Sequence, residues 1–231
     1  MALSTIRTKV ANIVNRDDIP DTAGGLIDGW INDAQRRVCR AYNFAFMESE
    51  ATASTVDEQQ NYALPTASGD DLRFKSEISL ELVNSYSYRV GLKRLYKQDL
   101  ERKAEYLDTT DYGEPRYYSI QKGQIYLFPT PDHTSNAETA WTLNLEYYGY
   151  LDDLSEDTDS NDLVSYHPDA LVALASADAF RYAHEEEKAE YWESKGKNYI
   201  EEMIREEQVN THGNLEEGME PEDGAGTSPR Y

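Results

Sequence analysis

The sequence predicts an α+β protein: a bundle of about four main helices, two N-terminal and two C-terminal, with an inserted antiparallel β subdomain and an extended C-terminal tail. Apolar residues recur at spacings of three and four near both ends of the chain, which is the period of an amphipathic helix. The middle of the chain alternates at period two between turn residues, which is typical of strands. The expected parts are N-terminal helices (1–48), a β subdomain (49–151), an acidic loop (152–165), C-terminal helices (166–208) and a tail (209–231).

Two helices are predicted before the β subdomain. Leu3–Val14 carries apolar residues at helical spacing. A longer helical pattern begins firmly near Leu26, after two glycines that weaken its first turn, and runs to Tyr42. Asp21 or Thr22 is the expected N-terminal cap of this second helix.

The β subdomain is predicted from alternating segments at 78–83, 86–92 and 141–148, with a short helix or turn over 98–107. The clearest segment is a hairpin within 113–132. Its turn contains Lys122 and Gly123, and the glycine tolerates a positive φ. Pro129 and Pro131 are expected to stop its second strand.

The C-terminal part follows a solvated acidic loop. Pro168 stands where the first position of a helix is expected, because its missing N–H costs nothing there. A tight turn is expected near His184, and the last helix is expected to end near Gln208. The segment 210–231 has Gly, Pro and acidic residues without periodicity, so by itself it is predicted to be disordered.

Composition excludes several classes of function. The formal net charge is −22, which argues against tight wrapping of nucleic acid but suits a surface past which DNA must slide. The 18 tyrosines suit protein interfaces. The chain has no apolar run near 18 residues and no signal-peptide pattern, so we expect a soluble protein made in the cytoplasm, without membrane contact. The single Cys39 permits no disulfide within one chain.

No motif predicts catalysis, a metal or a cofactor. Asp157, Asp159 and Asn161 have the opening rhythm of a calcium loop, but Asp162 replaces the required glycine and Pro168 the required glutamate. The segment 184–188 resembles half of a zinc-protease helix but lacks the second histidine. The acidic start of a helix explains it better, since carboxylates there complement the helix dipole.

A small basic cluster lies on the second predicted helix, opposite its apolar face. A solvated helix face is the favoured interpretation, and a salt bridge between subunits is the alternative. The cluster is Arg36, Arg37 and Arg40.

Four segments, taken in order, resemble the head-to-tail adaptor (connector) proteins of tailed bacteriophages. They are the helix 30–38 leading to Tyr42 and Phe44; the hairpin from Gly113-Glu-Pro to Leu127-Phe-Pro-Thr-Pro-Asp132; the strand 143–148; and Tyr166-His-Pro-Asp-Ala-Leu171 through Trp192. The resemblance covers roughly residues 1–208. Each segment alone is a generic fold signal, and the resemblance rests on their order and spacing.

The resemblance implies a structural virion protein at the neck, not an enzyme. It implies a ring of about twelve copies beneath the portal that continues the DNA channel and meets tail or nozzle proteins. It also implies that the C-terminal tail docks on the portal, through residues expected among Asn210, Leu215, Met219, Thr227, Pro229, Arg230 and Tyr231. Candidate contacts with a neighbouring subunit or the tail are Tyr117, Tyr126 and the three arginines.

Two other classes stay open from the sequence. An acidic DNA mimic or inhibitor would gather its carboxylates on one face, whereas here they are spread over loops, helices and tail. A hydrolase with a carboxylate site in the β subdomain is the third interpretation, although the number of carboxylates alone does not support it.

Overall fold

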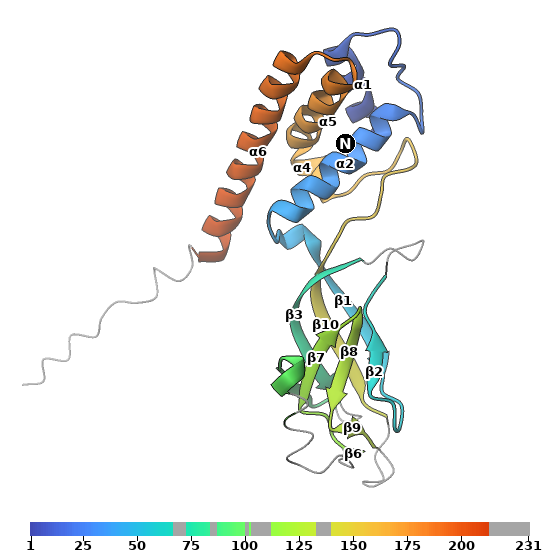
Figure 1. The fold of residues 1–231 in the computed structure, drawn as a ribbon, viewed down its shortest axis with the longest axis vertical. Helices are drawn as coiled ribbons and strands as arrows, with labels where there is room; N and C mark the ends of the chain where they lie inside the picture. Colours follow the sequence, from blue (N-terminus) through green and yellow to red (C-terminus); the bar gives the residue numbers. More distant parts are fainter. Residues whose placement is uncertain (67–72, 84–86, 100–101, 103–111, 133–139, 213–231) are drawn as a thin grey trace, which may run out of the picture. The chain divides into compact units, whose positions relative to one another are not determined.

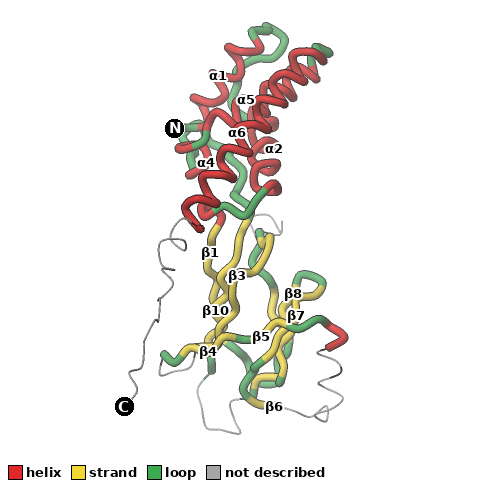
Figure 2. The backbone as a smooth tube through the Cα atoms, turned by 90° about the vertical axis from the view of Figure 1, so that its left-hand side faces the viewer, coloured by secondary structure: helices red, strands yellow, loops and turns green. Residues whose placement is uncertain are grey.

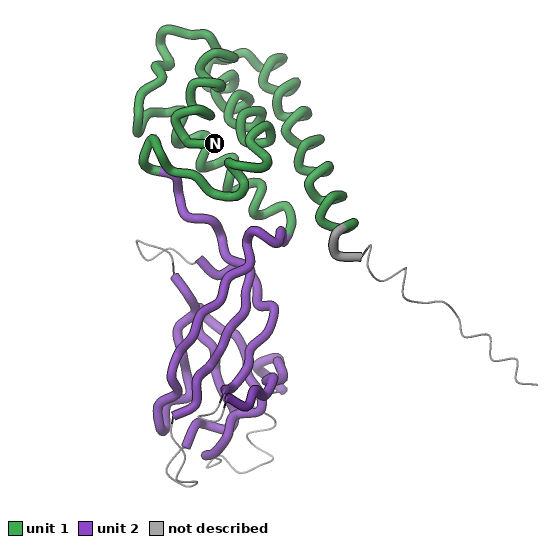
Figure 3. The backbone as a smooth tube through the Cα atoms, turned by 180° about the vertical axis from the view of Figure 1, so that it is seen from behind, with its two compact units in different colours: residues 1–42, 155–231 green, residues 43–154 purple. Residues whose placement is uncertain are grey.

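The computed structural model confirms an α+β protein with antiparallel sheets (Figure 1). It describes residues 1–66, 73–83, 87–99, 102, 112–132 and 140–212. Helices and strands occupy different stretches of the chain (Figure 2). The chain forms two compact units, a helical unit of Met1–Tyr42 with Ser155–Tyr231 and a β unit of Asn43–Leu154 (Figure 3).

The N-terminal helices begin where the sequence predicts. Helix α1 spans Leu3–Val14 and ends at Asn15, whose φ of 48° is left-handed. Helix α2 spans Leu26–Ala41. The predicted cap is wrong, because Gly25 occupies the N-cap position of α2. The segment before it forms a turn in which the Gly25 N–H donates to the carbonyl of Thr22 at 3.0 Å, and no side chain makes a capping hydrogen bond at this helix end.

Helix α5, Pro168–Tyr182, is the central helix of its unit. It packs against α1, α2 and α6, and most of its residues are buried. Pro168 occupies the first turn, as predicted. Small residues allow close approach: an ideal Cβ at Gly196 of α6 would lie 2.7 Å from a Leu174 methyl carbon. The predicted turn also forms, with His184 at a φ of 58°.

Helix α6 spans Glu186–His212, so the predicted end near Gln208 is wrong. Asn210, assigned from the sequence to the tail, lies inside this helix. Residues 209–212 include no Gly or Pro, and the first strong helix breaker is Gly213. The helix therefore continues through residues whose weaker propensity had indicated a tail.

A short helix lies inside the segment predicted to be an acidic loop. Helix α4 spans Asp162–Tyr166. The Asn161 side chain accepts a hydrogen bond from the Val164 N–H at 2.9 Å and so caps it. The acidic residues that indicated a loop lie mostly before this cap.

The β unit is a sandwich of two four-stranded sheets. One has the order β1-β10-β3-β4 and the other β2-β8-β7-β5, with a small β6-β9 pair beside them. Leucines from both sheets meet Trp141 in one buried cluster. The elements are η1 (Ala45–Met47), β1 (Glu48–Ser54), β2 (Asn61–Ala63), β3 (Phe74–Val83), β4 (Arg89–Gly91), β5 (Lys93–Arg94), β6 (Tyr112–Gly113), β7 (Tyr117–Gln121), β8 (Gln124–Phe128), β9 (Thr130–Pro131) and β10 (Thr142–Gly149).

The predicted hairpin is β7-β8. Gln121 pairs with Gln124 across a turn in which Lys122 and Gly123 both have positive φ, 48° and 72°. Both central residues therefore have the φ sign of a type I′ turn, which matches the twist of the strands.

The subdomain is not wholly antiparallel, because β5 pairs with β7, and β6 with β9, in parallel. Parallel pairing needs a connection longer than a hairpin turn, and 22 residues separate β5 from β7 while 16 separate β6 from β9. Most of the helix expected over 98–107 falls outside the described residues.

Candidate functional site

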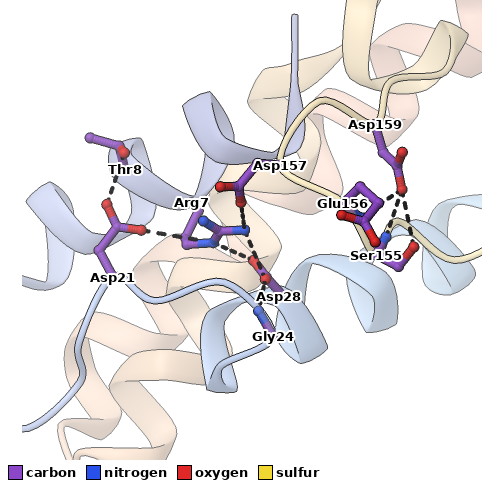
Figure 4. A network of polar contacts seen from close by, with 9 residues as sticks. All are labelled: Arg7, Thr8, Asp21, Gly24, Asp28, Ser155, Glu156, Asp157 and Asp159. Atoms are coloured by element: carbon purple, nitrogen blue, oxygen red, sulfur yellow. Dashed lines mark hydrogen bonds and ion pairs between the residues drawn. The ribbon is translucent and has the colours of Figure 1, made fainter.

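An ion-pair network whose centre, Arg7 and Asp28, is buried joins three segments of the helical unit (Figure 4). Arg7 of α1 donates from Nε to Asp28 Oδ1 at 2.6 Å and from Nη2 to Asp28 Oδ2 at 2.9 Å. Its Nη2 also lies 2.7 Å from Asp157 Oδ1, in the segment that returns from the β unit. The Gly24 N–H donates to Asp28 Oδ2 at 2.7 Å. One guanidinium thus holds α1, the start of α2 and the returning chain together.

Charge and burial act in opposite directions on Arg7. The hydrogen bond with Asp28 raises the pKa of the Arg7 guanidinium above its ordinary value, the contact with Asp157 adds to this, and burial opposes both. Arg7 and Asp28 have less than a tenth of their surface exposed. The polar atoms of the network pair with one another inside the helical unit, so its role is to hold structure.

The apparent calcium rhythm serves internal contacts instead. Asp159 accepts hydrogen bonds from the N–H groups of Ser155 and Glu156, both at 2.8 Å, and these bonds lower the pKa of its carboxyl. Asp157 pairs with Arg7, and Asn161 donates to Gln35 Oε1 at 2.7 Å. Within the described part of the chain, no cluster of His, Cys, Asp and Glu could hold a metal ion.

The three predicted arginines of α2 differ in their surroundings. Arg37 is half-buried and pairs with Asp178 of α5, so the predicted solvated face is wrong for this residue. Burial lowers the pKa of Arg37, and the neighbouring Arg181 lowers it further. Arg36 pairs with Asp33 on its own helix at 2.9 Å, and Arg40 is exposed.

Those contacts extend across the helices. Arg181 contacts Asp178 at 3.2 Å and also pairs with Glu193 of α6, which in turn accepts from Lys197 at 2.8 Å. The pairs Asp178–Arg181 and Glu193–Lys197 have local helical spacing, but the pairs that join α2 to α5 and α5 to α6 could not be found from spacing, because their members lie far apart in the sequence.

A surface groove lies over α1, α5 and α6, with a cavity of about 360 Å³. Lys195 Nζ lies 4.7 Å from the ring centre of Trp192 and 5.9 Å from that of Tyr199, in the range of cation–π contacts. Aromatic rings beside a cation suit contact with another protein. The lining residues are Lys9, Asn12, Ile13, Asp169, Val172, Trp192, Lys195 and Tyr199.

The two tyrosines of the hairpin, which were predicted from the sequence to be exposed contact residues, are half-buried. Tyr117 and Tyr126 lie on the outer side of β7 and β8, and Tyr126 donates to Gln124 Oε1 at 3.1 Å. More exposed tyrosines lie at positions that the sequence does not single out, because they are scattered over loops, helices and a short strand without a common spacing. They are Tyr88, Tyr96, Tyr112, Tyr166, Tyr182 and Tyr191.

A family model described as SU10 adaptor protein matches residues 1–216. The chain belongs to the SU10 adaptor protein family. This is a family of phage head-to-tail adaptors, so the resemblance noted from four sequence segments is confirmed. A search of curated proteins gave no match.

Membership of the SU10 adaptor family gives the chain a structural role in a phage virion, at the neck, with portal and tail components as its partners. None of the described helices is long and apolar enough to cross a membrane. Of the residues expected to bind the portal, Asn210 lies in α6. Leu215, Met219, Thr227, Pro229, Arg230 and Tyr231 lie outside the described residues.

Proposed function

We propose that this chain is the ring-forming head-to-tail adaptor of a tailed phage, placed beneath the portal, where it joins the capsid to the tail and continues the DNA channel. The observation that carries the proposal is the family match, which extends through both units and past the end of α6. The family resemblance gives the ring about twelve copies.

The helical unit supplies the rigid body of the proposed ring. Its four longer helices are α1, α2, α5 and α6, and α5 contacts the other three. The β unit enters after Tyr42 and leaves before Ser155, so it is an insertion into this helical body. The Arg7 network fixes the returning segment beside α1 and α2, which preserves the helical unit around a large insert.

The net charge of −22 supports a channel through which DNA slides. Acidic walls repel phosphates, so they prevent the salt-dependent binding that basic residues create. A DNA mimic would present its carboxylates to a partner, whereas several carboxylates here pair with arginines of the same chain, among them Asp28, Asp178 and Glu193.

We also propose that the segment after α6 binds the portal. Its residues 213–231 combine five carboxylates with Gly and Pro, which suits a strap that orders on binding. The strap begins at Gly213 and not at Asn210, because α6 extends through His212.

The test is reconstitution with purified portal, followed by size-exclusion chromatography with light scattering. The full chain should form a ring on the portal. A chain that ends at His212 should keep its thermal transition but lose portal attachment, while a chain shortened only by the last two residues serves as a graded control. Full attachment of the chain ending at His212 would refute the strap, and a full-length chain that stays monomeric with portal would refute the adaptor proposal itself.

A further inference from the structure

The β sandwich is open along one side. Strands β1 and β2 are the outer strands of the two sheets on this side, and a cavity of about 180 Å³ lies between them. We call β1, β2 and this groove the open edge. Core leucines reach the groove, so its floor is apolar; it is lined by Ala51, Thr52, Ala53, Tyr62, Ala63, Pro65, Leu80, Ile125, Leu143 and Leu145.

The opposite side of the sandwich is closed by the chain itself. Strand β4 is the outer strand of one sheet and β5 that of the other, and the single residue Leu92 joins them. Leu92 is buried, and its N–H donates to the Leu80 carbonyl at 2.8 Å. We call β4, β5 and the adjoining Tyr96 the closed edge; β4 and β5 come into view in Figure 2.

The two edges differ in charge. Glu48 and Glu50 are exposed on β1. Lys93 and Arg94 are exposed on β5, together with Arg89 on β4. Arg89 contacts Glu81 at 3.1 Å and Arg94 pairs with Glu77, yet their side chains remain 59% and 52% exposed. The chain has 44 acidic and 22 basic residues, so a basic edge departs from its overall composition. The basic closed edge is complementary in charge to the acidic open edge.

The edges are also complementary in shape. Tyr96 lies two residues after the end of β5 and is 81% exposed, the largest exposed fraction among the large hydrophobic side chains of the described residues. Exposed aromatic side chains that insert into apolar pockets are the usual anchors of protein interfaces. The open edge offers such a pocket, and the closed edge presents such a side chain.

We propose that the closed edge of one copy binds the open edge of a second copy of this chain, with Tyr96 in the groove between β1 and β2 and the basic strand β5 facing Glu48 and Glu50. The inference rests on the proposed ring. Each copy uses two different edges, so the same contact can repeat from copy to copy. The copies close into a ring when a whole number of the rotations between neighbours makes a full turn.

The proposal is tested with two blocked variants of the full chain, each assayed with portal by light scattering. Ala53→Trp fills the groove of the open edge, so that Tyr96 of a neighbouring copy cannot enter it. Tyr96→Glu removes the anchor and repels the acidic open edge. Each variant alone should form no ring, because one edge of every contact is damaged. In an equimolar mixture, the intact closed edge of the Ala53 variant can bind the intact open edge of the Tyr96 variant. The resulting dimer has no intact edge left, so the mixture should give dimers but no rings.

Tyr112→Glu is the matched control, with the same change on an exposed tyrosine of the same unit but on neither edge. It should form rings as the wild type does. Thermal melting of each variant checks that the β unit is folded. Rings formed normally by either blocked variant would overturn the inference. A blocked variant that forms rings but no longer binds a tail protein would also overturn it, because its edge would then contact the tail and not a neighbouring copy. A wild-type chain that forms no ring with portal overturns the proposed function instead.

A disulfide trap gives a second, independent readout. A chain with Ala53→Cys and Lys97→Cys, which keeps Tyr96 and places the cysteine on the exposed residue beside it, should give a ladder of covalent multimers beyond the dimer when rings are oxidised. Neither single substitution should do so, because the native Cys39 is buried. Rings without cross-links between these positions contradict the edge-to-edge contact but leave the adaptor role intact.

Discussion

Arg7 of α1 and Asp28 of α2 form a two-point ion pair, 2.6 Å from Nε to Oδ1 and 2.9 Å from Nη2 to Oδ2, with both side chains nearly excluded from water. Such a pair contributes little relative to well-packed apolar residues of the same size. Its removal from one side is costly, because the remaining charge stays buried without a partner. The network therefore fixes how α1, α2 and the returning segment fit together.

Substituting Arg7 by Ala should lower the free energy of unfolding of the helical unit by about 3–5 kcal/mol, because Asp28 stays buried without the guanidinium that pairs with it. Urea denaturation followed by circular dichroism measures this loss. Asp33→Ala removes the exposed pair with Arg36 and should change stability by less than about 1 kcal/mol. If the two substitutions lower the free energy of unfolding equally, the buried network contributes no more to stability than the exposed ion pair does.

Acid should destabilise the segment around Asp159. Backbone hydrogen bonds lower the pKa of this carboxyl in the folded chain, so its contribution is complete above the unfolded pKa of about 3.9 and is lost as the pH falls through the folded value. The melting temperature should therefore fall as the pH drops below about 4. Asp159→Asn cannot ionise, so the variant should show a shallower acid decline, measured by calorimetry from neutral pH downward. An unchanged slope would contradict the assignment.

The hairpin turn should respond in opposite directions to two substitutions. Lys122 adopts a φ of 48°, which costs a non-glycine residue about 1–2 kcal/mol, and Asn tolerates it better. Lys122→Asn should therefore stabilise the β unit by about 0.5 kcal/mol. Gly123→Ala should destabilise it by about 1 kcal/mol through conformation alone, because no atom lies within 4 Å of an added Cβ. Thermal melting of both variants checks the two signs, and a loss of stability in Lys122→Asn would contradict the turn assignment.

Features of the fold that depend on residues close together in the sequence could be predicted. Helix α1, the start of α5 at Pro168 and the β7-β8 hairpin depend on spacing and turn chemistry within a few residues. The C-terminal end of α6 could not be predicted as well, because weak helix formers near Asn210 continue a helix that had already formed.

The long-range contacts could not be predicted from one sequence. Arg7 and Asp28 are separated by 21 residues, and neither interrupts its helical pattern. The open edge was missed for the same reason. Which edge of β1 and of β2 stays unpaired depends on a sheet order that periodicity does not contain.

Two glycines in helices should respond oppositely to the same change. Glycine inside a helix costs about 0.8–1.0 kcal/mol relative to alanine, so Gly29→Ala in α2 should stabilise the helical unit by roughly that amount, because no atom lies within 4 Å of the added methyl. Gly196→Ala in α6 gains the same propensity but places its methyl 2.7 Å from a Leu174 methyl carbon and 2.8 Å from Cγ. Leu174 is buried at the α5–α6 contact, so it has little room to move, and overpacking typically costs about 1–3 kcal/mol. Gly196→Ala should therefore be neutral or destabilising by up to about 2 kcal/mol, measured by urea denaturation beside Gly29→Ala. If both substitutions stabilise the chain equally, α5 and α6 do not approach as closely in solution as this contact requires.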